Sequence, residues 1–111
     1  MKPVLRGLIL SLVMLLPLAA AAAEHEIAIT HMELESVEGD FRQGDTVRFI
    51  NRADITHNLY LTYEDGSMTN LDTQVPGTER SAVLEHEGKV LVRCWIHPII
   101  RLEIQAKART P

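Results

Sequence analysis

The chain has 111 residues, of which 46% are hydrophobic and 23% are charged, so it is long enough for one small domain. Its formal net charge is −4, from 11 basic and 15 acidic side chains, and no cluster of lysines and arginines occurs. This excludes a typical nucleic-acid-binding protein. A single cysteine, Cys94, excludes an internal disulfide.

The first 23 residues have the three parts of a secretory signal peptide. Lys2 and Arg6 precede an apolar run over residues 8–18, and alanine occupies every position from 19 to 23. The apolar run is shorter than the roughly 20 residues that span a bilayer. We therefore predict a signal peptide at residues 1–23, and one exported, periplasmic domain at residues 24–111 that is not stably inserted in a membrane.

We expect the exported protein to begin at Glu24, because the alanine run is the kind of small-residue site at which signal peptides are cleaved. Intact-mass analysis of the periplasmic fraction measures this, with a chain expressed without the first 23 residues as the mass standard. Retention of residues 1–23 in a membrane fraction would contradict the prediction.

The rest of the chain is predicted to be all-β. Apolar and polar residues alternate in six segments, which is the pattern of half-buried strands: 26–35, 46–50, 58–63, 81–86, 89–94 and 100–106. Glycine, proline and aspartate occupy the short stretches between them, and no amphipathic helix of useful length occurs. Six or seven short strands with close turns predict a two-sheet sandwich.

Potential metal ligands occur at two places next to these strands. Cys94 and His97 are three positions apart in the segment C-W-I-H-P, and His57 immediately precedes the segment 58–63. Two imidazoles and one thiolate are the donors of a trigonal copper site. In an oxidising compartment a lone cysteine is otherwise a nucleophile, an intermolecular disulfide partner or an inert buried thiol. A thiol hydrolase would also need an oxyanion hole, which nothing in the sequence supplies.

Three segments resemble the cupredoxins, the small blue copper proteins that include plastocyanin, amicyanin and pseudoazurin. Q-G-D-T-V-R-F-I-N at 43–51 is similar to their "GD-x-V-x-F-x-N" strand, and H-N at 57–58 to their first copper histidine and the asparagine after it. C-W-I-H-P-I-I at 94–100 is similar to their "C-x-x-H-P-x-M" ligand loop in the short, amicyanin-like spacing. The resemblance implies a Greek-key β-sandwich of about seven strands.

By the same resemblance His57, Cys94 and His97 are the ligands of one copper ion, and the protein is a one-electron carrier and not an enzyme. The family's axial methionine falls at Ile100, which has no donor atom. Loss of an axial donor disfavours Cu(II) more than Cu(I), so we expect a higher reduction potential than in a methionine-ligated relative. The side chain of Asn58 is expected to connect the His57 loop to the Cys94 loop.

Two further sets of residues have functional interpretations. Trp95, Pro98 and Ile99 are expected to form an apolar rim around His97 where a redox partner protein docks on a monomer. His25 and His31 are six apart and would share one face of a strand, where they are either solvated or part of a second metal site. If the chain were cleaved before Ala23, His25 would be its third residue. The new terminal amine and His25 could then chelate Cu(II) together. The alternative function is copper storage, delivery or resistance with the same three ligands.

Overall fold

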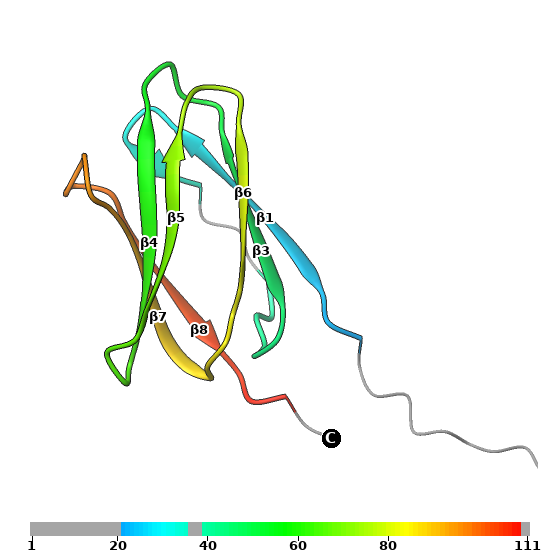
Figure 1. The fold of residues 1–111 in the computed structure, drawn as a ribbon. Coiled ribbons are helices and arrows are strands. Elements are labelled where there is room, and N and C mark those ends of the chain that lie inside the picture. Colours follow the sequence, from blue (N-terminus) through cyan, green and yellow to red (C-terminus); the bar gives the residue numbers. More distant parts are fainter. Residues whose placement is uncertain (1–20, 36–38, 110–111) are drawn as a thin grey trace, which may run out of the picture.

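The computed structural model describes residues 21–35 and 39–109, which form two four-stranded β-sheets packed face to face (Figure 1). The strands are β1 (Glu24–Thr30), β2 (Glu33–Leu34), β3 (Thr46–Asn51), β4 (His57–Tyr63), β5 (Met68–Gln74), β6 (Glu79–Val83), β7 (Gly88–Cys94) and β8 (Arg101–Ala106). The described part therefore has eight strands and no helix, which confirms the predicted all-β sandwich with one strand more than expected.

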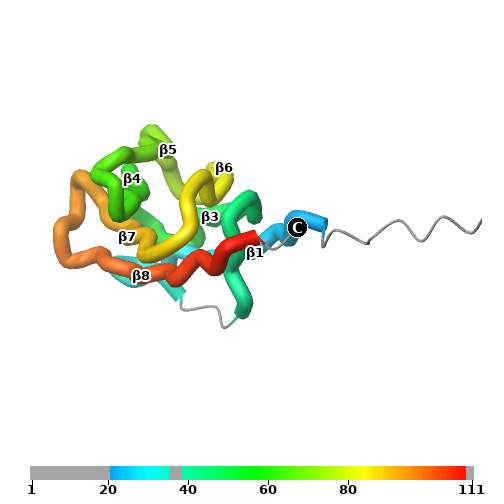
Figure 2. Tube along the Cα trace, turned by 90° about the horizontal axis from the view of Figure 1, so that it is seen from below, coloured from blue at the N-terminus to red at the C-terminus, as the bar shows by residue number. Residues whose placement is uncertain are grey.

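The chain passes repeatedly between the two sheets. One sheet has the order β2-β1-β3-β6 and the other β5-β4-β7-β8, so the connections β3–β4, β5–β6 and β6–β7 all cross the sandwich. β1 runs parallel to β3, and the other paired strands are antiparallel. Seen along the strands, the two sheets enclose one interior (Figure 2). This is the Greek-key sandwich that the resemblance implied.

The core is built from the alternate positions that the sequence pattern selected. Inward side chains of both sheets form one apolar cluster, which includes Ile27, Ile29, Val47, Phe49, Leu59, Leu61, Leu84, Val90, Val92 and Ile104. Each fully buried side chain of this size contributes about 1.5–3 kcal/mol to folding. The period-2 pattern therefore identified both the strands and the face of each that is buried.

Two elements differ from the prediction. The segment 26–35 is two strands, because the chain turns at residues 31–32, where His31 has a φ of 48°. β5 was not predicted, since it is an edge strand in which only Leu71 and Gln74 are buried. Such a strand has one neighbour and one largely solvated face, so the alternation that marks the other strands is missing.

Asp45 joins three segments at the end of the sandwich where β3 begins. Its buried carboxylate accepts hydrogen bonds from the Ala23 and Arg42 amides at 3.0 Å each and pairs with His25 Nε2 at 2.8 Å and Arg109 Nη2 at 2.6 Å. Burial alone would raise the pKa of Asp45, but the hydrogen bonds from His25 and the two amides lower it overall. Asp45 thus holds both ends of the domain to β3.

No helix in the described residues could span a bilayer. Apart from residues 21–23, the predicted signal peptide lies outside the described residues. Ala23, at the predicted boundary, is bonded to the sheet: its amide donates to Asp45 and its carbonyl accepts from the Thr46 amide at 3.0 Å.

We expect Asp45→Asn to lower the free energy of unfolding at pH 7 by about 3 kcal/mol, since it removes a buried carboxylate that pairs with the half-buried Arg109 and accepts hydrogen bonds from His25 and two backbone amides. Because the pKa of Asp45 is lower in the folded than in the unfolded chain, the carboxylate stabilises the fold fully above about pH 4, and this stabilisation is lost as pH falls through the folded pKa. Urea unfolding from pH 7 to pH 2 should therefore show a flatter acid dependence in the variant.

Asp40→Asn is the matched control, because Asp40 pairs with Lys107 at 2.7 Å where both side chains are exposed. It should change the stability at pH 7 little. Equal losses in the two variants would contradict a special role for Asp45.

Candidate metal centre

The pairing of β4 with β7 brings two of the predicted ligands to one edge of the second sheet. Leu59 is directly opposite Cys94 in the register, and His57 points inward like Leu59 because it is two residues away. Cys94 is the last residue of β7 and His57 the first of β4. His97 follows in the loop 95–100 that connects β7 to β8.

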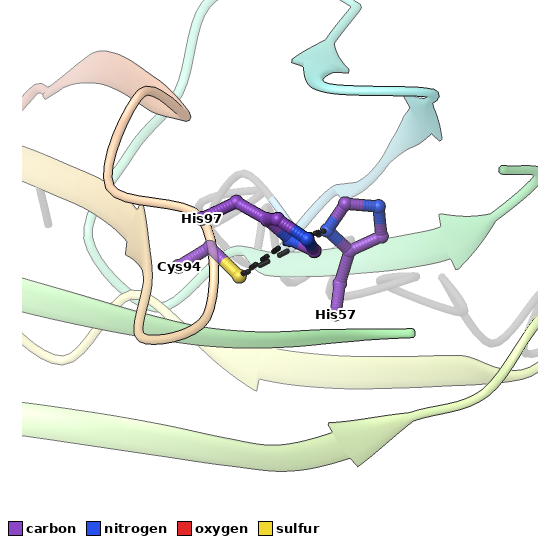
Figure 3. A group of neighbouring side chains, drawn as sticks. All are labelled: His57, Cys94 and His97. Carbon is purple, nitrogen blue, oxygen red and sulfur yellow. Dashed lines mark hydrogen bonds between the residues drawn. The ribbon is translucent and has the colours of Figure 1, made fainter. Parts of the chain in front are cut away.

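The three donor atoms face a common point (Figure 3). Cys94 Sγ is 3.8 Å from His57 Nδ1 and 3.8 Å from His97 Nδ1, and the two Nδ1 atoms are 3.3 Å apart. Among the described residues this is the one group of three or more histidine, cysteine or acidic side chains close enough to bind a metal ion together.

These separations fit a single trigonal ion. A metal ion would lie about 2.0 Å from each nitrogen and about 2.3 Å from the sulfur. With these bond lengths, the donor–donor distances of 3.3 and 3.8 Å correspond to donor–ion–donor angles of about 105–125°. His57, Cys94 and His97 would therefore be able to hold one metal ion with three donors. A soft thiolate with two imidazoles in a trigonal arrangement is the donor set of blue copper sites.

The centre is shielded from water on most sides. His57 is 0% exposed and Cys94 is 2% exposed, whereas His97 is half-buried. Burial lowers the pKa of His57, and the neighbouring His97 lowers it further. A contact with the His31 backbone opposes this shift but falls short of a hydrogen bond. Nε2 of His57 is therefore buried with no hydrogen-bond partner among the described residues. His57 is therefore held as a neutral imidazole, the form that binds metals.

Hydrogen bonds of the backbone connect the ligand loop to the start of β4. The Asn58 amide donates to Cys94 Sγ at 3.4 Å, and the Asn58 carbonyl accepts from the Trp95 amide at 2.9 Å. The Ile100 amide donates to the His97 carbonyl at 3.0 Å. The Asn58 backbone thus links the two loops. The expected link through the Asn58 side chain is not found, since that side chain makes no hydrogen bond to any described residue.

The axial and rim positions are in different surroundings. Ile100 is buried in the apolar core cluster that also contains Cys94, so no thioether or other side-chain donor occupies its place. Around His97 the loop exposes apolar side chains: Trp95 is 55%, Ile96 50% and Ile99 78% exposed. Ile96 belongs to this rim although the sequence analysis did not include it.

Asn51 is a supporting residue that the sequence analysis quoted in a motif without giving it a role. Its side chain is buried at the end of β3, where Nδ2 donates to the carbonyls of Ile55 and Gln74 at 2.9 Å each and Oδ1 accepts from the Ala53 amide at 3.0 Å. These bonds hold the segment 52–56 that leads into His57. The sequence signal for this role was an asparagine at the end of a strand of alternating apolar residues, because asparagine side chains often hydrogen-bond the nearby backbone.

The other histidines considered for a second metal site are apart from each other. His25 pairs with Asp45 and packs against the ring of Phe41, and His31 lies in the exposed turn after β1. Neither belongs to a group of potential ligands within the described residues, so the structure gives no support to a second site there.

Solved structures with this arrangement define the class of fold. An oxidized amicyanin variant superposes with a TM-score of 0.65 at 22% identity, covering 76% of this chain and 82% of that one. A purple cupredoxin from Nitrosopumilus maritimus superposes with a TM-score of 0.64 at 19% identity, covering 75% and 99%. The fold is that of the cupredoxins. No protein-family model matches the sequence.

Relatives in sequence identify the family more narrowly. The methylamine utilization protein MauL of Methylorubrum extorquens is 50% identical over 112 residues, which cover 98% of each chain. MauL of Methylophilus methylotrophus is 38% identical over 78% of this chain and 51% of its own length, and MauL of Methylobacillus flagellatus is 33% identical over 82% and 62%. The chain belongs to the MauL family, and it spans about half to two-thirds of the length of the latter two relatives.

We expect Asn51→Ala to lower the free energy of unfolding by about 3 kcal/mol, since two buried backbone groups and one partly buried group lose their partner. Urea denaturation of the metal-free protein measures this. Asn58→Ala is the control and should stay within about 0.5 kcal/mol of the unchanged protein, because that side chain makes no hydrogen bond in the described part. A larger loss of stability in Asn58→Ala than in Asn51→Ala would show that the Asn58 side chain, and not that of Asn51, supports the site.

Proposed function

We propose that this protein is a mononuclear copper protein that carries single electrons between exported redox proteins. The observation that carries the proposal is the trigonal group of His57 Nδ1, Cys94 Sγ and His97 Nδ1, whose separations fit one copper ion. Copper bound there supplies one-electron redox chemistry. The name of the MauL relatives and the fold of the amicyanins support a place in methylamine utilization.

The surroundings of the three donors suit electron transfer. Two ligands come from the ends of paired strands and the third from a short loop with its own hydrogen bonds, so little can move when the charge of the ion changes. Burial of His57, Cys94 and Ile100 keeps water from the ion. Small rearrangement and a dry site both lower the barrier to transfer of one electron.

The exposed apolar rim provides a contact for a partner. Trp95, Pro98 and Ile99 all lie in the loop that carries His97, and all three are exposed. A redox partner docking on this rim would approach the copper through the half-buried His97 ring. We propose that the protein acts as a monomer, with this rim left open to the partner.

Export to the periplasm completes the proposal. The domain is proposed to begin at Glu24, and in the structure the residue before it, Ala23, makes two hydrogen bonds to the sheet, with Asp45 and Thr46. The intact mass distinguishes a start at Ala23 from the start at Glu24 that the sequence predicts.

Purified protein given Cu(II) should bind one equivalent and develop an intense visible band from thiolate-to-copper charge transfer. In Cys94→Ser this band should disappear, because the serine oxygen cannot replace the sulfur orbital overlap. Absorption spectra and metal analysis of both proteins measure this, with Ser81→Ala on β6 as a control that leaves the three donors intact. An unchanged band in Cys94→Ser would rule out thiolate ligation.

Reversible one-electron cycling in voltammetry is expected of the same copper-loaded protein. A stable Cu(I) complex that is not oxidised at accessible potentials and passes its copper to another protein would favour copper delivery instead.

We expect Ile100→Met to lower the reduction potential, because a thioether reaching the ion from the axial side stabilises Cu(II) more than Cu(I). The two side chains have similar volume, so the exchange should cost less than about 1.5 kcal/mol in packing. Voltammetry of both proteins in one buffer measures the sign, and Ile100→Leu controls for packing alone. A higher potential in Ile100→Met, or an unchanged one despite a copper–thioether contact, would contradict axial control.

A further inference from the structure

A row of four side chains crosses the outer face of the second sheet beside the ligand loop. The register places Tyr60 opposite both Asn70 and Arg93, and Arg93 opposite Arg101, so the row runs from β5 through β4 and β7 to β8. All four side chains point away from the core. We call this set, together with Trp95, the arginine–aromatic face.

The aromatic half of this face is rigid. The Trp95 indole stacks on the Tyr60 ring with centroids 3.9 Å apart and an angle of 22°, and its Nε1 donates to Asn70 Oδ1 at 3.0 Å. Even so, Trp95 is 55% exposed. A large aromatic surface that is held in one orientation before binding loses little conformational entropy when a partner covers it.

The cationic half is unusual for a protein with a net charge of −4. Arg93 and Arg101 are directly opposite each other on adjacent strands, and like charges in that relation destabilise a sheet. Neither has a carboxylate within ion-pair distance among the described residues, whereas Lys89, on the same strand as Arg93, pairs with Glu103 at 3.1 Å. No carboxylate of the described residues therefore offsets the repulsion between Arg93 and Arg101.

The arginine–aromatic face lies close to the proposed copper site. Arg93 and Trp95 flank Cys94 in the chain, and one terminal nitrogen of Arg93 donates to the Pro98 carbonyl at 3.1 Å within the ligand loop. A group bound to this face is thus separated from the Cys94 thiolate by the thickness of one strand. Tryptophan, tyrosine and arginine are also the residues that most often dominate binding energy at protein interfaces.

From these observations we propose that the arginine–aromatic face docks an acidic surface of a partner protein, whose carboxylates pair with Arg93 and Arg101 beside the Trp95–Tyr60 stack. The proposal rests on the proposed electron-carrier function and adds the charge of the partner to it. An acidic partner and this acidic chain repel each other elsewhere, so the local attraction selects one orientation in which the ligand loop faces the partner.

The first test measures binding without copper. Metal-free ¹⁵N-labelled protein is titrated with a short oligoglutamate peptide at low ionic strength, and with oligolysine as the opposite-charge probe. The chain has one tryptophan, so its indole N–H signal is unambiguous. We expect this signal and the Arg93 and Arg101 amides to shift together with oligoglutamate only, and the shifts to vanish near 1 M salt, where the screening length is about 3 Å.

Variants locate the attraction. Arg101→Glu should abolish the oligoglutamate shifts, and Arg101→Gln should reduce them. Arg42→Gln is the matched control, because Arg42 is also outside the ion pairs of the described residues but lies at the Asp45 end of the sandwich. Absence of any shift with oligoglutamate, or an equal loss in Arg42→Gln, would overturn the proposal.

The second test links docking to electron transfer in the copper-loaded, reduced protein. One electron passes to hexacyanoferrate(III), which becomes hexacyanoferrate(II), and no bond forms or breaks. At low ionic strength Arg101→Glu should slow this reaction about fivefold or more, since it replaces a positive charge near the trivalent anion with a negative one. The cation tris(phenanthroline)cobalt(III) should react no more slowly. Normal oligoglutamate binding in a protein that binds no copper would refute the electron-carrier function and not the docking face.

Discussion

The register of β4 against β7 is the constraint on which the rest of the centre depends. Because Leu59 is opposite Cys94, His57 must point to the same interior edge as the thiol, and the short loop after Cys94 returns His97 to that edge. A slip of one residue would turn either His57 or Cys94 to the outer face of the sheet. The apolar core that stabilises the sandwich therefore also positions the donors, since Leu59, Leu61, Val90 and Val92 set the same register.

The two ends of the sandwich differ in how their buried polar groups are paired. At the Asp45 end, a buried carboxylate has hydrogen-bond and ion-pair partners from three segments, which are Ala23 and His25, Arg42, and Arg109. At the other end, His57 Nδ1, Cys94 Sγ and His97 Nδ1 face one another, and no acidic side chain of the described residues belongs to this group. Three groups with lone pairs that point to one place are the arrangement a bound cation would stabilise.

The ligand loop connects the interior of this site to its surface. Trp95 is hydrogen-bonded to Asn58 through its backbone and to Asn70 through its indole, and Arg93 holds the Pro98 carbonyl. Side chains of the same segment thus orient His97 on one side of the sheet and present aromatic and cationic groups on the other. The exposed face of the segment is therefore only a few bonds from Cys94 and His97 in the interior.

The amino-acid sequence by itself predicted the class of fold and the strands with alternating apolar residues, and it named His57, Cys94 and His97 as candidate ligands that the structure brings together. Periodicity and side-chain chemistry are local properties, so they can be read without the tertiary structure. The sequence did not predict β5, because this edge strand buries only two side chains and lacks the alternation of apolar and polar residues. Its pairing with β4 stabilises it instead. The sequence assigned the link between the loops to the side chain of Asn58, whereas the Asn58 backbone makes that link and the buried Asn51 side chain supports the loop before His57. Only the tertiary structure decided that His25 pairs with Asp45 instead of His31, and that Arg93 and Arg101 meet across two strands. These relations join residues far apart in the chain, and strand order and register, which the whole core sets, decide which of them are neighbours.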